Sequence, residues 1–195
     1  MPRIGQNPSR GKTLDLTPAR TTIAVLVYAP HQAGYFQDRL DVTRMTIESI
    51  LSNTQEPFNL LVFDGTELVY TSNKSATQIL EPGYYGLSNA ELGAQWPKCV
   101  RGAQGLKQIV QSDFGAADLV GLLHDSDVPP DEDLPHRGRP ISLERRTASC
   151  FIVGDEYGTR ASTIIVMSDD NLKFTEQSYL AGGISAGLVD YDLPV

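Results

Sequence analysis

Residues 157–167 read Tyr-Gly-Thr-Arg-Ala-Ser-Thr-Ile-Ile-Val-Met, a stretch that begins as a turn and ends as a strand. The glycine gives the backbone the freedom to turn, and the β-branched run at residues 164–167 is typical of a mostly buried strand. The side chains of Thr159, Arg160 and Ser162 are therefore expected at the mouth of a rigid strand, where they suit an anion or a polar ligand. The alternative is that Arg160 pairs with a nearby acid and the hydroxyls bond to loop amides.

A second corner lies at residues 81–89, Glu-Pro-Gly-Tyr-Tyr-Gly-Leu-Ser-Asn, in which two glycines bracket two aromatic residues. Glycine permits close approach of the backbone, and the side chains of Ser88 and Asn89 can hydrogen-bond a ligand or their own loop. We predict that the two corners converge, so that Asn89 and Arg160 line one cavity. The candidate ligand-binding residues are Tyr84, Tyr85, Ser88, Asn89, Tyr157, Thr159, Arg160 and Ser162.

Length and charge restrict the class of protein. The chain has 195 residues, a length that is enough for one domain. Its formal net charge is -8. Residues 1–20 carry four basic residues and one acidic residue, a local charge of +3, so the remaining residues carry -11 (-8 minus 3). An acidic body does not suit a phosphate backbone, so nucleic acid is not an expected partner. With no apolar run of membrane-spanning length and no signal-peptide core, we expect a soluble, cytoplasmic protein without an integral membrane segment.

The cysteines and histidines do not predict a metal site. Cys99 and Cys150 make no disulfide framework, and no histidine lies at zinc-ligand spacing from them. One disulfide between them is an alternative, but buried free thiols are the expected state. His31, His124 and His136 are scattered in or near predicted loops and are expected to be solvated.

Hydrophobic patterns predict an α+β protein built from short strands and amphipathic helices. Strands are expected at Thr22–Tyr28, Phe58–Phe63, Leu68–Thr71, Ala148–Val153, Ile164–Met167 and Leu172–Ser178, and helices at about 36–53, 97–111 and 116–123. The polar, proline-containing residues 1–20 are expected to form a flexible tail. Residues 21–180 are expected to form a single domain, and residues 181–195 a frayed C-terminal tail.

Residues 21–65 resemble the start of a nucleotide-sugar glycosyltransferase. The resemblance rests on two apolar strands, the sequence of the predicted helix between them, and Asp64 after the second strand. It implies that Asp64 helps to hold the nucleotide, and that Asp125 and Asp127 supply an Asp-x-Asp motif for Mn or Mg with a nucleotide sugar. The alternative for Asp125 and Asp127 is a solvated surface turn, because they open an acidic loop that contains two prolines.

Residues 58–179 resemble the NRDE family, also called the Transport and Golgi organisation protein 2 family. The motifs that carry this resemblance are Phe58-Asn59-Leu60-Leu61, Tyr70 with Ser72-Asn73, Pro82-Gly83-Tyr84-Tyr85-Gly86-Leu87-Ser88-Asn89, Trp96-Pro97-Lys98, Leu134-Pro135, Tyr157-Gly158-Thr159-Arg160-Ala161-Ser162-Thr163 and Phe174-Thr175-Glu176. The resemblance implies a partial αββα sandwich like that of N-terminal-nucleophile hydrolases, with mostly antiparallel sheet. It also implies handling of haem, lipid or acyl-CoA, without a settled reaction.

The start of the chain departs from the family pattern. The family normally exposes a cysteine behind the initiator methionine and carries Asn-Arg-Asp-Glu soon after, whereas this chain begins Met1-Pro2-Arg3 and has neither. An N-terminal nucleophile uses its own α-amine as the base, so the usual catalytic group is absent. Residues 21–57 are atypical for the family and form a βαβ-like segment. Cleavage before Thr21 or Thr22 would expose a threonine amine instead.

Three hypotheses follow from the sequence. The first is a non-catalytic or weakly active binder of a small amphipathic or anionic metabolite, of the haem, lipid or acyl-CoA class. The second is a glycosyltransferase-like enzyme that uses Asp64 with Asp125 and Asp127. The third is a truncated or fused product without independent activity. The first predicts antiparallel strands after residue 58, and the second needs residues 22–28 and 58–63 to run parallel. The sequence leaves the ligand and the oligomeric state open.

Overall fold

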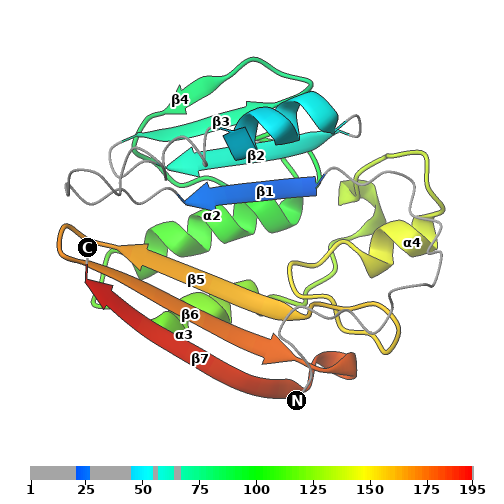
Figure 1. Ribbon diagram of the computed structural model, residues 1–195. Coiled ribbons are helices and arrows are strands. Elements are labelled where there is room, and N and C mark those ends of the chain that lie inside the picture. Colours follow the sequence, from blue (N-terminus) through cyan, green and yellow to red (C-terminus); the bar gives the residue numbers. More distant parts are fainter. Residues whose placement is uncertain (1–20, 27–44, 55–56, 64–66, 195) are drawn as a thin grey trace.

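The structure is a computed structural model that describes residues 21–26, 45–54, 57–63 and 67–194, with residues 21–26 described by their backbone alone. In this part of the chain, two β-sheets and several helices form an α+β fold (Figure 1). Most strand pairs are antiparallel, as the sequence predicts. The predicted tail at residues 1–20 lies outside the described residues.

The first sheet has the strand order β1-β2-β3-β4. Its strands are β1 (Thr21–Leu26), β2 (Phe58–Phe63), β3 (Leu68–Ser72) and β4 (Gln78–Leu80). β2 runs parallel to β1 and antiparallel to β3, so its two neighbours run in opposite directions. Parallel strands need a crossover connection, and a helix over residues 45–53 lies between β1 and β2 in the chain. The βαβ-like segment predicted from the sequence is therefore present, and its predicted helix start at residue 36 lies outside the described residues.

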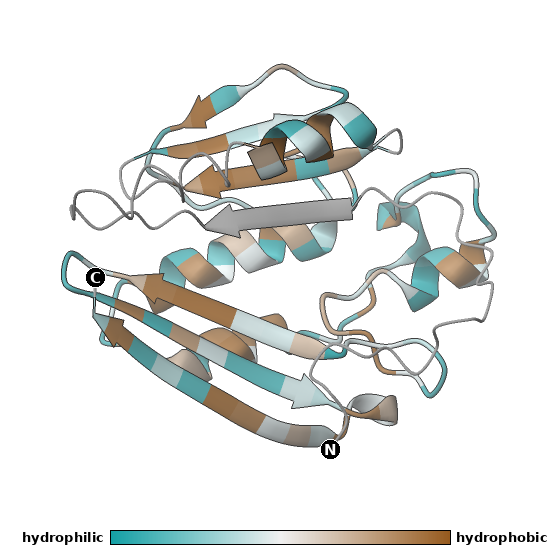
Figure 2. Ribbon diagram, viewed as in Figure 1, coloured by the Kyte–Doolittle hydropathy of each residue, from teal (hydrophilic) through white to brown (hydrophobic). Residues whose placement is uncertain are grey.

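The second sheet is antiparallel and has the order β5-β6-β7. Its strands are β5 (Ala161–Met167), β6 (Asn171–Tyr179) and β7 (Ser185–Pro194). The predicted hairpin between the first two strands is confirmed, and its turn is closed by the amide of Ser168, which donates to the carbonyl oxygen of Asn171 at 2.8 Å. Along β7, a hydrophobic band is followed by mostly hydrophilic residues and then by a hydrophobic residue near the end of the strand, as Figure 2 shows.

Helices α2 (Pro97–Ile109) and α3 (Ala116–Leu123) confirm the two helices predicted for this region. Pro97 occupies the first turn of α2, where its missing amide costs nothing. α3 packs against both α2 and β5, while α4 (Ile141–Arg146) lies at the right-hand end of the molecule in Figure 1. The short 3-10 helices η1 (Asp131–Asp133) and η2 (Ala181–Gly183) complete the described helices. None of the helices in the described ranges combines the length and the apolar character that crossing a bilayer requires.

The core is built from a few fully enclosed side chains. Phe58, Leu60, Tyr70 and Phe151 have at most 1% of their surface exposed. Burying an aromatic or leucine side chain of this kind stabilises a fold by about 1.5–3 kcal/mol. Because β2 supplies two of these four residues from the middle of its sheet, it is the central strand of the described core.

The predicted strand at Ala148–Val153 is wrong. These residues form a bent loop, although Ala148 and Phe151 are buried. Their backbone groups bond to scattered partners instead of a neighbouring strand: the Phe151 amide donates to the Asp125 carbonyl oxygen at 2.7 Å. The apolar run therefore reflects burial in a loop. Burial alone does not produce the backbone hydrogen bonds to a neighbouring strand that define a β-strand.

The C-terminal residues also differ from the expectation of a frayed tail at residues 181–195. Residues 185–194 form strand β7, which pairs with β6 along its whole length. Every residue of β7 is exposed, so the strand is held by backbone hydrogen bonds and not by burial. In the described part of the chain β7 is an edge strand with one unpaired side.

Candidate functional site

The loop at residues 85–89 lies against the start of α2. A Cβ atom at Gly86 would collide with the backbone of Cys99. Only glycine allows this approach without displacing α2, which explains why a glycine follows the two tyrosines. The contact places the Ser88 and Asn89 side chains beside the helix.

A buried polar network fixes the other end of this loop. Asn59 is fully enclosed, and its Nδ2 donates to the carbonyl oxygen of Ala90 at 2.8 Å. The Tyr70 hydroxyl donates to Asn59 Oδ1 at 2.9 Å and accepts from the Leu92 amide at 3.3 Å. Since an enclosed amide is costly unless it is hydrogen-bonded, this network specifies one position for the loop relative to β2 and β3.

A cavity of about 690 Å³ lies between this loop, α2, α3 and β5. The apolar side chains of its lining, which we call the apolar wall, come from the loop, α2, α3 and β5 and are Leu87, Leu106, Leu119, Leu122, Leu123, Ile164 and Ile165. The polar side chains of its lining, which we call the polar wall, come in part from the same elements and are Ser88, Asn89, Lys98, Cys99, Arg101, Asp125, Cys150 and Thr163. The volume is within the range of small-molecule sites, which combine an apolar lining with a few polar groups.

Arg101 and Asp125 form the ion pair of the polar wall. Arg101 Nε donates to Asp125 Oδ2 at 2.9 Å, and Arg101 Nη2 donates to the Asp127 carbonyl oxygen at 3.0 Å. The Arg101 and Asp125 side chains are 37% and 26% exposed, so water screens the pair only in part. The pair joins α2 to the loop that follows α3.

Lys98 is the second cation of the polar wall. Its Nζ donates to the carbonyl oxygens of Thr147 at 3.0 Å and, more weakly, Ser149 at 3.5 Å. Burial lowers the pKa of Lys98, an effect that the nearby Cys99 partly opposes. The side chain thus connects α2 to the loop that carries Cys150.

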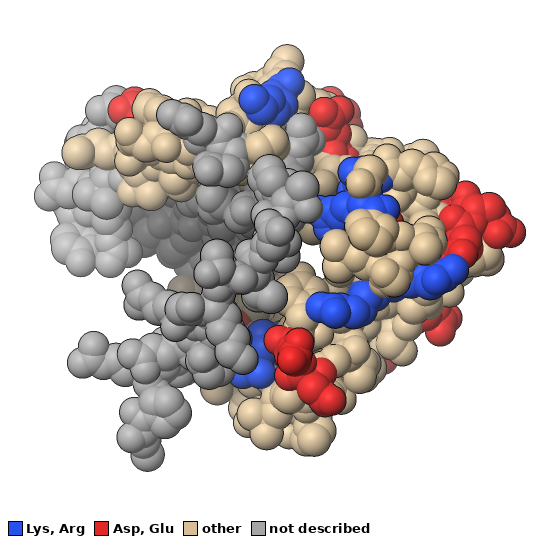
Figure 3. All heavy atoms as spheres, turned by 90° about the vertical axis from the view of Figure 1, so that its right-hand side faces the viewer, with Lys and Arg blue, Asp and Glu red and all other residues tan. Residues whose placement is uncertain are grey.

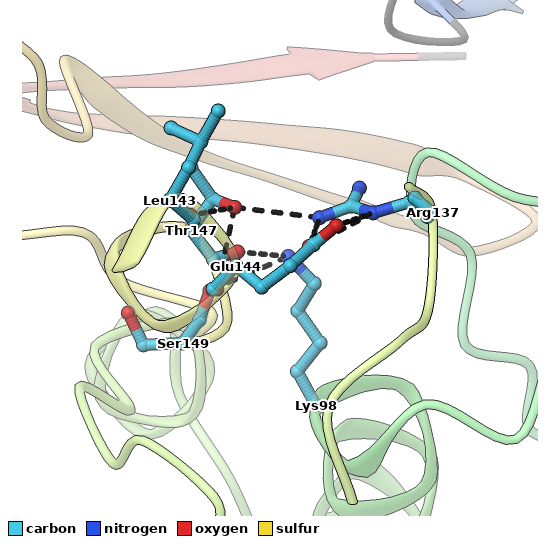
Figure 4. A network of polar contacts seen from close by, with 6 residues as sticks. All are labelled: Lys98, Arg137, Leu143, Glu144, Thr147 and Ser149. Carbon is cyan, nitrogen blue, oxygen red and sulfur yellow. Dashed lines mark hydrogen bonds and ion pairs between the residues drawn. The ribbon is translucent and has the colours of Figure 1, made fainter. Parts of the chain in front are cut away.

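A second polar network holds that loop in place, as Figure 4 shows. Arg137 forms an ion pair with Glu144, whose side chain is 3% exposed, and the Arg137 guanidinium also donates to Thr147 Oγ1 at 3.4 Å. The guanidinium carbon lies 4.8 Å from the centre of the Trp96 ring, a cation–π distance. Arg137 therefore links the residue before α2, helix α4 and the turn that accepts the Lys98 ammonium.

Both cysteines are free and face the same cavity. Burial raises the pKa of Cys99 and also raises the pKa of Cys150. At neutral pH the thiols therefore stay protonated, and a protonated thiol is a weak nucleophile. The predicted state of buried free thiols fits Cys99, while Cys150 is half-buried.

The predicted site residues divide into two groups. Tyr85, Ser88 and Asn89 line the cavity, whereas the other predicted residues are absent from its lining. Those other residues are Tyr84, Tyr157, Thr159, Arg160 and Ser162. Next to the 157–160 corner, Thr163 lines the cavity instead, together with Ile164 and Ile165, which follow it.

The 157–160 corner has a structural role in its own loop. Thr159 Oγ1 accepts a hydrogen bond from the Ile152 amide at 2.9 Å, and the Thr159 amide donates to the Ile152 carbonyl oxygen at 2.8 Å. Arg160 is exposed, and its carbonyl oxygen accepts from the Tyr179 amide at 2.8 Å. The alternative in which the threonine hydroxyl serves a loop amide is therefore correct for Thr159.

The alternative nucleotide and metal residues are placed only in part. Asp64 lies outside the described residues. Asp125 is in the ion pair with Arg101, and its Oδ1 accepts from the Asp127 amide at 2.9 Å. Across the residues that the structure describes, no three His, Cys, Asp or Glu side chains are grouped as a metal site would require.

The sequence interpretation missed the two cations of the cavity. Lys98 and Arg101 are three residues apart on α2, a spacing that puts both on one face of a helix. Leu106 and Leu122, which lie on the helices predicted at 97–111 and 116–123, also line the cavity. The signal in the sequence was a basic pair at helical spacing beside an otherwise apolar helix face.

Comparison with known proteins identifies related sequences. The family model described as Transport and Golgi organisation 2 matches residues 33–181. The Transport and Golgi organization protein 2 homolog of Bos taurus is 34% identical over 142 residues, which cover 63% of this chain and 51% of that protein. The homolog of Homo sapiens is 31% identical over 147 residues, 66% of this chain and 52% of that protein. The chain spans about half the length of these curated relatives. No solved structure matches it significantly.

Proposed function

Because the chain belongs to the Transport and Golgi organisation 2 family, we propose that it has the binding role that its motifs imply. In this proposal the protein is a non-catalytic or weakly active binder of a small amphipathic or anionic metabolite, of the haem, lipid or acyl-CoA class. The names of the relatives state no ligand, and the chain spans about half of their length. Support for the proposal therefore comes from the cavity.

The observation that carries the proposal is the amphipathic lining of the cavity. The lining combines leucine and isoleucine side chains with the cations Lys98 and Arg101. An amphipathic ligand can bury its apolar part against the apolar side chains and place its anionic part beside the cations. Water or a small ion would leave the apolar wall without a partner.

The state of the thiols supports binding over catalysis. A cysteine nucleophile needs a lowered pKa, whereas burial raises the pKa of both Cys99 and Cys150. We also propose, from the family resemblance, that the two sheets and the helices belong to a partial αββα sandwich and that the protein is cytoplasmic. A solved structure and cell fractionation would test these two points.

A titration that follows Trp96 fluorescence tests the binding proposal. Trp96 is the sole tryptophan of the sequence and precedes α2, on which both cavity cations lie. We expect palmitate, haem or palmitoyl-CoA to change its emission in a saturable way. No saturable change with any of these compounds, confirmed by calorimetry, would contradict the proposal.

A cavity-filling substitution sharpens the test. Gly102 lines the cavity, and a Cβ atom there would meet nothing within 4 Å, so Gly102→Leu can fill space without a clash. We expect it to weaken binding at least about tenfold. The fold should gain about 0.5–1 kcal/mol, because leucine favours a helix more than glycine. Gly121→Leu on α3 is the matched control, since it also meets open space but lies outside the cavity.

The glycosyltransferase-like alternative retains one favourable observation. β1 and β2 run parallel with a helix between them, as a nucleotide-binding βαβ unit requires. A thermal shift that needs both UDP and manganese would support this alternative. Arg101 already neutralises Asp125, so a metal at Asp125 would have to displace that ion pair.

A further inference from the structure

The charges at the cavity and in the network behind it do not cancel. The cations are Lys98, Arg101 and Arg137, and the carboxylates are Asp125 and Glu144. Arg101 pairs with Asp125, and Arg137 pairs with Glu144. Three cations against two carboxylates leave one positive charge, which lies on Lys98. Among the described residues no carboxylate comes within ion-pair distance of its ammonium.

The described hydrogen bonds of Lys98 leave one ammonium donor without an acceptor. An ammonium group has three donors, and two of them bond to the carbonyl oxygens of Thr147 and Ser149. The second of these contacts, at 3.5 Å, is at the limit of hydrogen bonding. The Trp96 ring, whose centre lies 6.0 Å from Nζ, is a further, weaker partner. A partly buried cation without a counter-ion is unfavourable, so an anion that enters the cavity gains a strong partner there.

From this charge balance we infer that the ligand of the cavity is a monoanionic amphiphile, whose carboxylate binds Lys98 and whose hydrocarbon chain lies along the leucine wall. The inference rests on the proposed binding function and, within the haem, lipid and acyl-CoA class, favours a lipid with one carboxylate over haem and acyl-CoA, which carry several negative charges. A single carboxylate neutralises the single unmatched charge. A ligand with several negative charges would bring more charge than the described cations of the site can balance.

The titration of Lys98 supplies a second readout. Burial lowers the pKa of Lys98 in the free protein, and a bound carboxylate would raise this pKa again. The groups that act on Lys98 are Cys99, Cys150, Arg137 and Glu144. The two thiols have raised pKa values and stay neutral at neutral pH. Binding should therefore take up a proton above the pKa of the free lysine, and the affinity should fall as the pH rises through that range.

The experiment compares three ligands that share one chain: decanoate, 1-decanol and decyl phosphate. Calorimetry with wild-type protein, below the micelle concentration of each ligand, should show decanoate binding about 10- to 100-fold more tightly than decanol. Decyl phosphate, which carries nearly two charges at neutral pH, should bind more weakly than decanoate. In wild-type protein, the decanoate enthalpy should also depend on the ionisation enthalpy of the buffer at alkaline pH.

Substitutions assign the preference to one residue. Lys98→Met should remove the preference for decanoate and leave the decanol affinity within about twofold, while Lys98→Arg, which retains the charge, should keep a preference. Lys107→Met is the control, because Lys107 is exposed in the last turn of the same helix and does not line the cavity. The proton-uptake measurement uses wild-type protein, so it tests the inference of a carboxylate at Lys98 even if Lys98→Met fails to fold.

The outcomes separate this inference from the binding proposal. If none of the three ligands binds, the inference of a monoanion is overturned, and the proposed binding function itself fails only if palmitate, haem and palmitoyl-CoA also give no saturable change. If decanol binds as tightly as decanoate, or decyl phosphate binds more tightly than decanoate, the cavity binds amphiphiles and the inference of a monoanion is overturned. A folded Lys98→Met protein that keeps the decanoate preference also overturns it, as does binding without proton uptake at alkaline pH.

Discussion

Two arginine–carboxylate pairs meet at α4, and their surroundings differ. Arg137 holds Glu144 where the two side chains are 20% and 3% exposed. Arg145, the residue after Glu144, pairs with Asp131, and these two side chains are 49% and 48% exposed. On the face shown in Figure 3, which is the α4 end of the molecule, acidic and basic side chains lie close together in solvent. Both arginines engage their carboxylates with two nitrogens, so burial and not geometry separates the two pairs.

The difference predicts which pair the fold depends on. Removing one partner of a buried pair leaves an uncompensated charge, whereas an exposed charge is solvated by water. The buried pair also holds the turn whose carbonyl oxygens accept the Lys98 ammonium. Stability and the shape of the cavity should therefore depend together on Glu144, and neither should depend on Asp131.

The largest effect is expected for Glu144→Gln. This substitution keeps the size of the side chain and removes the charge that Arg137 needs. We expect a loss of about 3 kcal/mol in the free energy of unfolding, near the low end for buried pairs because the Arg137 side chain keeps 20% exposure. Urea unfolding monitored by circular dichroism measures it. A loss indistinguishable from that of Asp131→Asn would remove the distinction between the two pairs.

An intermediate effect is expected when both buried charges are removed. Arg137→Met combined with Glu144→Leu replaces the pair with apolar side chains of similar volume. Such replacements are often close to neutral, so the double variant should unfold within about 1 kcal/mol of wild type and be more stable than Glu144→Gln. The double variant and Glu144→Gln should be compared by urea unfolding under identical conditions. If the double variant were the less stable of the two, hydrogen bonds to Thr147 would matter more than the ion pair.

The smallest effect is expected for Asp131→Asn. The hydrogen bond from Arg145 lowers the pKa of Asp131 from its ordinary value of 3.8. A lowered carboxyl pKa contributes stability above the unfolded value and loses it as the pH falls through the folded value, so any contribution of this carboxylate is present above about pH 4, including pH 7, and is lost in more acidic solution. Because this pair is open to solvent, thermal melts at pH 7 should agree within error. A clear drop in the melting temperature of Asp131→Asn at pH 7 would show that the exposure of an ion pair does not predict its contribution to stability in this protein.

The sequence predicted the elements whose signal is local. β2 and α3 have the predicted bounds, because an apolar run of strand length and a helical apolar face each determine their own structure. Residues 148–153 carry the same kind of apolar run but form a loop, because their amides bond to distant groups such as the Asp125 carbonyl oxygen. β7 was missed for the opposite reason: its residues are exposed, and pairing with β6 makes it a strand.

The position of the cavity residues could be predicted where it depends on loop chemistry and not where it depends on packing, while a ligand-binding role for them stays a prediction. The glycine-flanked corner at 81–89 supplies Tyr85, Ser88 and Asn89 to the cavity. The arginine at the cavity is Arg101 and not Arg160, because α3 and β5 enclose the face of α2 that carries it. Which side of a helix faces a cavity depends on the elements packed around it, and one sequence does not contain that information.

The open edge of β7 has a practical consequence for work with the purified protein. Within the described ranges, the backbone amides and carbonyls on one side of residues 185–194 have no partner strand, and such an edge is a template for strand addition. The two aspartates on this strand, Asp190 and Asp192, repel a second copy while they are ionised. Self-association should therefore increase in acidic or high-salt buffers, so storage and crystallisation trials are best begun in dilute, neutral, low-salt solution.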